Sequence, residues 1–390
     1  MRKKSMFVAV SLILIVALST AVVFAVKAGE MEFAGTEVKL SLEDAKKEML
    51  TNGTAIEAAE LKLKQDKAKT TSYYESLSNL YRLEAAADEA KAAGMGGMIS
   101  GPSKNSKLMA DASATFAKAQ APRNYEAAVN KIVRDTVESY FGLAAAKEAF
   151  RISQENVVIQ EKLYQNTLSK FNLGVVAKQD VLMAEYGLND AKVTAEQREN
   201  EYIIARMGFN IQYGYDLMQD VTITDTLEKA VMSKISLSGA IALALANRNE
   251  IHDAGFKLKR AELNLDSIRN TTSRTSSTYK NAVVGLAGAQ VAAANAPKQV
   301  ELDVRKKYLN MMQKASEVEL DKQNVANAKE NYRLAGLQYD AGMATLTDTQ
   351  QAQVKAYQAE QKYYTTLLSY NLAILDYEQA TTVGTSSVDL

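Results

Sequence analysis

The stretch KFNLGVVAKQDV at residues 170–181 has a counterpart much later in the chain, AGLQYDAGMATLTD at residues 335–348. In each stretch an aromatic residue stands three positions before a glycine, and an aspartate follows that glycine by six: Phe171, Gly174 and Asp180, then Tyr339, Gly342 and Asp348. Glycine is the usual left-handed residue just past a helix end, and an aspartate favours the first turn of a helix. Each stretch therefore predicts a tight turn between two helices.

The two turns belong to a duplication that covers most of the chain. Residues 41–64 match residues 236–259 at an offset of 195. Ala-Pro-Arg at 121–123 matches Ala-Pro-Lys at 296–298 at an offset of 175, and the turns match at an offset of 168. A repeat in this fixed order predicts two copies of one structural unit.

Each copy has the pattern of helix, loop, helix, tight turn and helix. In the first copy Ser41-Leu42-Glu43-Asp44 resembles a capping box, and a longer helix is expected from residue 54 to about 93. A glycine-rich run at 94–102 ends it. Pro122 suits the first turn of the next helix, which is expected to reach Phe171 after roughly 75 Å. A return helix is expected over 178–212.

Large residues recur every seven positions along these helices. The positions are Leu143, Phe150, Val157, Tyr164 and Phe171; Met311, Val318, Val325, Tyr332 and Tyr339; Val181, Leu188, Ala195, Tyr202 and Phe209; and Thr349, Ala356, Tyr363, Tyr370 and Tyr377. Such a period is typical of supercoiled helices packed on partner helices, although an ordinary bundle core has similar patterns. The expected helix length favours coiled-coil hairpins that need neighbours, and therefore an oligomer.

The composition excludes several classes of function. Lys and Arg number 46 and Asp and Glu number 46, so the balanced charge argues against a nucleic-acid partner. The chain has no Cys and one His, His252, which argues against a thiolate nucleophile, a metal site and a Ser/His/Asp catalyst. We therefore expect no enzyme activity, no cofactor and no metal, with His252 at the surface or capping a helix.

The N-terminus has the pattern of an export signal. Arg2, Lys3 and Lys4 precede an uncharged stretch over 5–26, and small residues follow at Ala25 and Ala28. This predicts a signal peptide at 1–28, with an uncleaved anchor as the alternative because the apolar stretch is long enough to span a bilayer. The first repeat then occupies 29–225 and the second 226–390, both outside the cytoplasm.

The two turn stretches, together with the repeat start at 41–45, resemble the TolC family of outer-membrane efflux proteins. The resemblance covers about residues 40–384 and rests on the duplicated order of the motifs. It implies a homotrimer in which six hairpins line a hollow helical tunnel. It also implies a periplasmic adaptor at the turns and an inner-membrane pump that drives substrates through the tunnel.

The sequence departs from that family where transmembrane strands are expected, near 94–121 and 270–296. Residues 108–116 alternate in polarity and form one candidate strand, but 270–277 is polar and 282–296 is rich in alanine, which favours a helix. The expected fold is therefore all-α or nearly so, with the β-barrel strands short or absent.

The resemblance also implies roles for the turn residues. Asp180 and Asp348 correspond to aspartates that form a ring narrowing the tunnel entrance, and a carboxylate ring favours cations. The alternative is that each aspartate only stabilises the start of a helix. The family's closing contacts are incomplete, because Ala344 replaces an arginine and Gln351 an aspartate.

The turns also correspond to the family's adaptor contact. The residues implied in this contact are Phe171, Gly174, Val175, Val176, Tyr339, Gly342, Met343 and Ala344. Backbone geometry alone explains the glycines, whereas exposed apolar side chains beside them favour a partner surface. The function implied is a trimeric export conduit of the cell envelope. The alternative is an envelope scaffold of the same fold that lacks a barrel.

Overall fold

The computed structural model describes residues 33–95, 100–269 and 271–390, so the signal segment predicted at 1–28 lies outside the described residues. The described chain is almost entirely helical, as predicted. Its elements are β1 (Ala34–Leu40), α2 (Leu42–Thr51), α3 (Thr54–Ala92), α4 (Lys104–Asn172), α5 (Lys178–Tyr213), β2 (Gln219–Ile223), α6 (Leu237–Asn247), α7 (Asn249–Arg269), α8 (Ser277–Asp340) and α9 (Leu346–Gln379).

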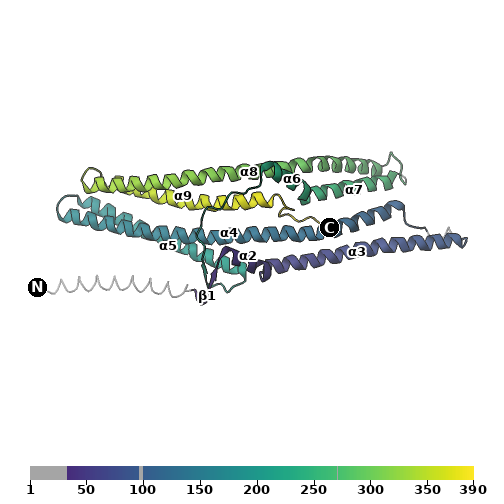
Figure 1. Cartoon of the computed structure of the whole chain (residues 1–390), viewed down its shortest axis with the longest axis horizontal. Coiled ribbons are helices and arrows are strands. Elements are labelled where there is room, and N and C mark those ends of the chain that lie inside the picture. Colours follow the sequence, from purple (N-terminus) through teal and green to yellow (C-terminus); the bar gives the residue numbers. More distant parts are fainter. Residues whose placement is uncertain (1–32, 96–99, 270) are drawn as a thin grey trace.

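The order of helices α2 to α5 is repeated by α6 to α9, and the long helices lie along one axis (Figure 1). α4 packs antiparallel on α5, and α8 packs on α9 in the same way. Both of these hairpins turn at the same end of the molecule, while α3 meets α4, and α7 meets α8, at the opposite end (Figure 1). The two hairpins lie side by side through contacts between α4 and α9.

Serine side chains cap the starts of several helices, and one of these caps was predicted from the sequence. The Ser41 hydroxyl accepts from the Asp44 N–H at 3.1 Å, which confirms the predicted start of α2. Ser103, Ser236 and Ser276 cap α4, α6 and α8 through the same type of bond. The predicted ends of α3 and α5 agree with the structure within about two residues.

The predicted start of α4 was wrong. The helix begins at Lys104, so Pro122 lies inside it, and its 69 residues span about 100 Å. The candidate strand at 108–116 is therefore helical, because alanine at alternate positions favours a helix more than a strand. In the second repeat Pro297 likewise lies inside α8, and the predicted helix over 282–296 is confirmed.

Two short parallel strands join the start of the first repeat to the linker between the repeats. Val38 pairs with Val221 and Leu40 with Ile223. The buried Tyr140 of α4 donates its hydroxyl to the Leu40 carbonyl at 3.0 Å. The sheet therefore ties both segments to the middle of α4.

Apolar packing forms one large cluster at the middle of the molecule and a smaller one near the turns. The large cluster includes predicted heptad positions on four helices, among them Leu143, Phe209, Met311 and Tyr377. The smaller cluster consists of Leu163, Ala184, Tyr339 and Leu346. Only part of each predicted heptad is buried, and Phe171 is exposed.

The segment after α9 links the two repeats. The Asn124 side chain of α4 donates to the Val388 carbonyl at 2.7 Å and accepts from the Val388 N–H at 2.9 Å. Asn249 of α7 donates to the Ser386 carbonyl at 3.0 Å. Side-chain amides from both repeats thus bind the backbone of residues 386–388, and this supports the packing of α4 on α7.

Candidate functional site at the hairpin turns

The backbone of both turns follows from their glycines. Gly174 and Gly342 have φ of +74° and +73°, a region that non-glycine residues enter only at a cost. The Val175 N–H donates to the Lys170 carbonyl at 2.9 Å, and the Met343 N–H donates to the Gln338 carbonyl at 2.8 Å. The Gly174 N–H donates to the Phe171 carbonyl, and the Gly342 N–H donates to the Tyr339 carbonyl. Together these hydrogen bonds form the Schellman motif at each helix end. The duplicated motif therefore builds the same turn twice.

Large apolar side chains beside the glycines point into solvent. Val175 and Met343 are 69% and 76% exposed, and Leu173 is 79% exposed. Val176 and Ala344 are half-buried. Sequence reasoning missed Leu173, although its place next to the turn glycine was the available signal. The turns thus present an exposed apolar surface, a common feature of partner sites.

Asp180 and Asp348 occupy matching positions in the first turns of α5 and α9. The Asp180 carboxylate accepts from the Ala177 N–H at 3.1 Å. The Asp348 carboxylate accepts from the Thr345 N–H at 3.0 Å and from the Thr345 hydroxyl at 2.6 Å, and the Asp348 N–H donates to that hydroxyl. Both aspartates therefore stabilise helix starts, while Asp348 remains exposed.

Two hydrogen bonds from Thr345 lower the pKa of Asp348 below its ordinary value, and the bond from the hydroxyl has a larger effect than the bond from the N–H. They favour the charged form because they are made to the carboxylate. Asp348 is therefore a carboxylate at neutral pH, as a charged ring at the entrance would require.

The two hairpins touch near the turns through a set of polar contacts, which we call the tip contact: Asn166, Thr167, Lys170, Tyr339 and Asp340. The Tyr339 hydroxyl lies 2.9 Å from the Thr167 hydroxyl. Lys170 donates to the Tyr339 carbonyl at 2.9 Å, pairs with the Asp340 carboxylate at 3.2 Å and lies 3.7 Å from the centre of the Tyr339 ring. Asn166 donates to Asp340 at 2.8 Å.

Among the residues implied in the adaptor contact, Tyr339 differs from the others. It is only 6% exposed and lies within the tip contact, whereas its counterpart Phe171 is exposed. Lys170 and Asp340 both lie within the two turn stretches, but the sequence did not predict a role for either residue. Their pairing joins residues 170 positions apart, and no local spacing signals such a contact.

Further from the turns, the contact between the hairpins is also polar. Ser153, Gln160 and Thr167 recur every seven residues on α4 and are buried. Gln160 donates to the Gln353 side chain of α9 at 2.8 Å, and Gln353 in turn donates to Asn156. Within each hairpin, by contrast, the buried positions of α5 are mostly apolar. The two hairpins are therefore held to each other by hydrogen bonds in addition to the two apolar clusters, which both contain residues of both hairpins.

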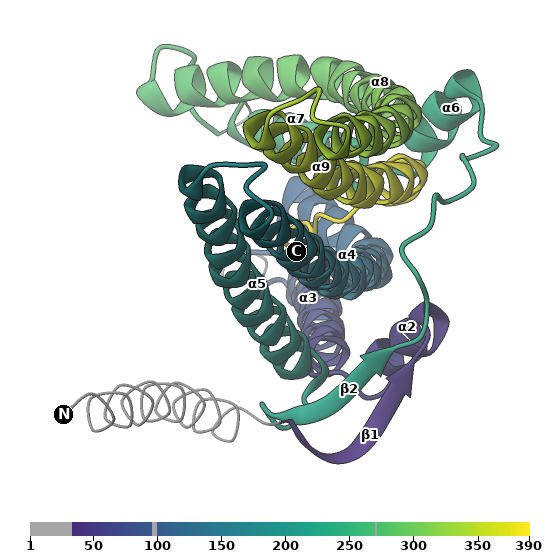
Figure 2. The same cartoon turned by 90° about the vertical axis from the view of Figure 1, so that its left-hand side faces the viewer.

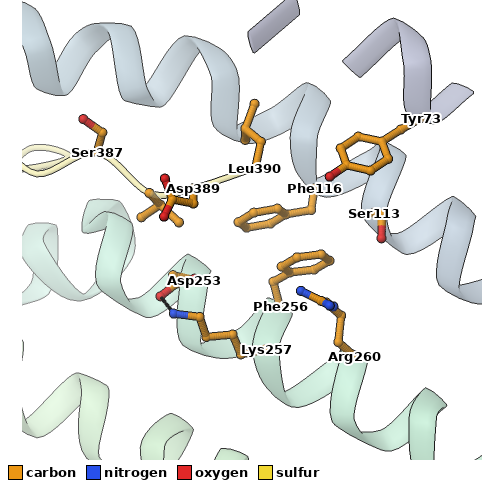
Figure 3. Close-up of a pocket in the computed structure, with 11 residues that line it drawn as sticks. Tyr73, Ser113, Phe116, Asp253, Phe256, Lys257, Arg260, Ser387, Asp389 and Leu390 are labelled. Carbon is orange, nitrogen blue, oxygen red and sulfur yellow. Dashed lines mark hydrogen bonds and ion pairs between the residues drawn. The ribbon is translucent and has the colours of Figure 1, made fainter. Parts of the chain in front are cut away.

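A pocket and His252 are further features of the described residues that could form a site. A pocket between α4, α7 and residues 387–390 contains the stacked rings of Phe116 and Phe256 and the Asp253–Lys257 ion pair, 2.6 Å long (Figure 3). Burial, with the Arg123 charge, lowers the pKa of His252, which is therefore neutral at pH 7. Within the described ranges no group of three or more His, Cys, Asp or Glu could hold a metal, and no helix is long and apolar enough to cross a membrane.

The fold and turns define a class of paired helical hairpins, and solved structures share it. The Campylobacter jejuni CmeC outer membrane channel is 15% identical, with 88% of this chain and 86% of that chain covered at a TM-score of 0.67. VceC, an outer membrane protein of Vibrio cholerae, is 12% identical, with 88% and 97% covered at 0.67. The open state of the Neisseria gonorrhoeae MtrE outer membrane channel is 15% identical, with 88% and 90% covered at 0.62.

No protein-family model matches the chain, and no curated protein does so either. The likeness to outer-membrane channels is therefore one of fold, which it confirms over nearly nine-tenths of the chain. At this identity it does not extend to activity or partners. The predicted resemblance in fold to TolC-type proteins is confirmed on this basis.

Proposed function

We propose that the protein is one subunit of a homotrimeric helical conduit in the cell envelope, through which substrates are exported. The observation that carries the proposal is a pair of exposed apolar faces on opposite edges of the molecule, along α5 and α8. In Figures 1 and 2, α5 lies at one edge of the layer formed by α4, α5, α8 and α9, and α8 lies at the other edge.

The two faces have helical spacing. The exposed residues are Leu182, Tyr186, Val193, Ile204 and Ile211 on α5, and Val284, Val291, Leu302, Leu309 and Leu320 on α8. On α8 successive residues of this set are alternately seven and eleven positions apart. Two such intervals make about five helical turns, so the residues lie on one face of the helix. α4 and α9, which pack on each other, expose far fewer large apolar residues.

Different faces that meet between copies form a heterologous interface, which produces a closed ring when the rotation closes. With α5 of one subunit packed on α8 of the next, three subunits would place six hairpins in one ring. Such a ring would leave a passage along its axis. The fold likeness to outer-membrane channels supports this assembly, because these proteins have the same hairpin arrangement.

The turns are the proposed end of the conduit at which an adaptor and an inner-membrane pump would act. We assign the adaptor contact to the exposed Leu173, Val175 and Met343, and the narrowing of the entrance to Asp180 and Asp348. The predicted export signal and an envelope or outer-membrane location belong to the same proposal.

A scaffold role in the envelope is the second candidate. Residues 104–121 and 277–296 are helical. This observation favours a scaffold, because strands are expected in this part of a TolC-type channel. A scaffold requires no open passage, so the cross-section of the assembly separates the two functions.

The test is the mass and cross-section of the protein without residues 1–28. Sedimentation equilibrium should give three times the subunit mass, and small-angle X-ray scattering of that species should give a hollow cross-section. A monomer at all concentrations would overturn the assembly. A trimer with a filled cross-section would favour the scaffold over the conduit.

A further inference from the structure

The packing of α4 on α7 forms a joint between the two repeats within one chain. Arg123 of α4 reaches the bend between α6 and α7, where its guanidinium donates to the Asn247 carbonyl and to the Asn249 side-chain oxygen, the latter at 3.0 Å. Two helical turns before Arg123 on α4, Phe116 stacks on Phe256 of α7 with ring centres 3.8 Å apart (Figure 3).

The duplication supplies a second copy of every residue in this joint. At the offset of 175 that relates the two Ala-Pro motifs, Phe116 corresponds to Val291 and Arg123 to Lys298 on α8. At the offset of 195 that relates the repeat starts, the residues Asn247, Asn249 and Phe256 correspond to Asn52, Thr54 and Leu61. The second set lies on α8 and on the bend between α2 and α3.

Within one chain this second set does not meet. α3 and α8 lie at opposite edges of the molecule in both views (Figures 1 and 2). Val291 and Leu61 are 61% and 52% exposed, and Lys298 and Thr54 are exposed too. Among the described residues, no hydrogen bond or ion pair is made by the side chain of Lys298 or Thr54.

The surrounding helix face shows the same contrast. On α4, Gln120 and Ala127 lie on the same helix face as Phe116 and Arg123, and both are buried almost completely. The corresponding Asn295 and Leu302 of α8 are exposed. The repeat thus presents one face twice: α4 covers it with the chain's own α7, and α8 leaves it bare.

We propose that a second copy of this chain covers that face, with α8 of one subunit packed on the α2–α3 bend of the next in the manner of the joint between α4 and α7. Lys298 donates to the Asn52 carbonyl and the Thr54 hydroxyl of the neighbouring subunit, and Val291 packs on the neighbour's Leu61. The inference rests on the proposed homotrimer and specifies which residues meet at its subunit interface.

The chemistry of the substituted residues fits this role. Lys298 keeps the positive charge and donors of Arg123, and Asn52 and Thr54 keep a carbonyl and a side-chain oxygen as acceptors. Val291 and Leu61 replace a stacked aromatic pair by an aliphatic pair. The proposed interface between subunits therefore keeps a polar contact and an apolar contact, as in the joint, but with smaller side chains. The polar contact differs in geometry, because a lysine lacks the planar guanidinium of an arginine.

The absence of cysteine makes a crosslinking test clean. The variant Thr54→Cys/Lys298→Cys, prepared without residues 1–28, is treated with a reducible bifunctional methanethiosulfonate reagent about as long as the lysine side chain that it replaces. The products are separated under non-reducing denaturing conditions. In a closed ring each subunit contributes position 54 to one interface and position 298 to the other. The expected products are therefore covalent dimers and trimers, which reduction returns to monomers. In the matched control Arg123→Cys/Asn249→Cys the same reagent should bridge two positions of one chain, so the product should remain at monomer mass.

A second negative control pairs Lys298→Cys with Val231→Cys, an exposed position on the linker between the repeats. The inference is overturned if the native assembly is a trimer but Thr54→Cys/Lys298→Cys crosslinks no better than this pair. If sedimentation shows only monomers, the proposed homotrimer itself has failed. Leu61→Cys/Val291→Cys repeats the test on the apolar half, in case one substitution disturbs the polar contacts.

Discussion

At the scale of single residues, Lys170 has the most concentrated set of contacts near the turns. Its ammonium group contacts the Tyr339 carbonyl, the Tyr339 ring and the Asp340 carboxylate, and only 17% of its side chain is exposed. The Asp340 carboxylate is more than half exposed, so solvent screens that pair and its contribution is small. The bond to the carbonyl and the contact with the ring therefore dominate.

We predict that Lys170→Met lowers the free energy of unfolding by about 1.5–3 kcal/mol, the usual range for a hydrogen bond to a charged group. The apolar stem of methionine retains the packing on Tyr339. The measurement is the urea midpoint at one fixed subunit concentration, since assembly contributes to apparent stability. Lys355→Met, on an exposed part of α9, is the control and should change stability by less than about 0.5 kcal/mol.

Asp348 provides a prediction on pH. Its pKa in the folded protein lies below the ordinary value near 3.8 because the Thr345 hydroxyl and N–H stabilise the carboxylate. The stabilising effect is therefore present above the pKa of the unfolded chain and is lost as pH falls through the folded pKa. In Thr345→Ala the carboxyl titration followed by NMR should move upward, toward the ordinary value. An unchanged titration would contradict the assigned cause.

At the scale of elements, each hairpin depends on one glycine with a left-handed backbone. Gly174 and Gly342 end α4 and α8 with the Schellman bonds described above. A Cβ atom added at either position meets no atom within 4 Å. Any cost of substitution therefore comes from the backbone angle and not from a clash.

We predict that Gly174→Ala and Gly342→Ala each destabilise the protein by about 1–2 kcal/mol. Gly336 is the matched control, since it lies inside α8, has no positive φ and also has free space for a Cβ. Gly336→Ala should instead stabilise by about 0.5–1 kcal/mol, because alanine favours a helix interior. Opposite signs in thermal or urea unfolding would support the assignment, whereas equal effects would contradict it.

At the scale of the whole molecule, the repeat leaves two different edges for a neighbour to cover. The α5 edge and the α8 edge carry most of the exposed large apolar residues on the long helices α4, α5, α8 and α9. Water contact with this much apolar surface is unfavourable. Assembly is therefore expected to depend on these edges, together with the α2–α3 face that α8 of a neighbouring subunit is proposed to cover.

We predict that Ile204→Lys and Leu309→Lys each raise the dissociation constant of the trimer at least about tenfold. Burying such a side chain contributes about 1.5–3 kcal/mol, and about 1.4 kcal/mol is a factor of ten. The control is Val158→Lys on α4, which is equally exposed but lies off both edges. Sedimentation equilibrium over a range of concentrations measures all three, and an unchanged trimer in both edge variants would contradict the proposed contact.

Local sequence signals were enough to predict the repeated helical units, the two turns and the cap at Ser41. These depend on neighbours within a few positions, such as the glycine that ends α4 or Ser41 with Asp44. Where a local signal was ambiguous the prediction was wrong: Pro122 suggested a helix start, and the alternation at 108–116 suggested a strand, yet both lie inside α4.

Long-range packing determines which faces of these helices are covered, and the sequence did not predict them. It paired Lys170 with Asp340, bound the backbone of residues 386–388 between Asn124 and Asn249, and buried the joint around Arg123 while leaving its counterpart at Lys298 bare. These contacts join residues more than a hundred positions apart. The heptad period shows which residues lie on one apolar face of a helix. It does not specify which other helix covers that face, so the long-range contacts could not be predicted from it.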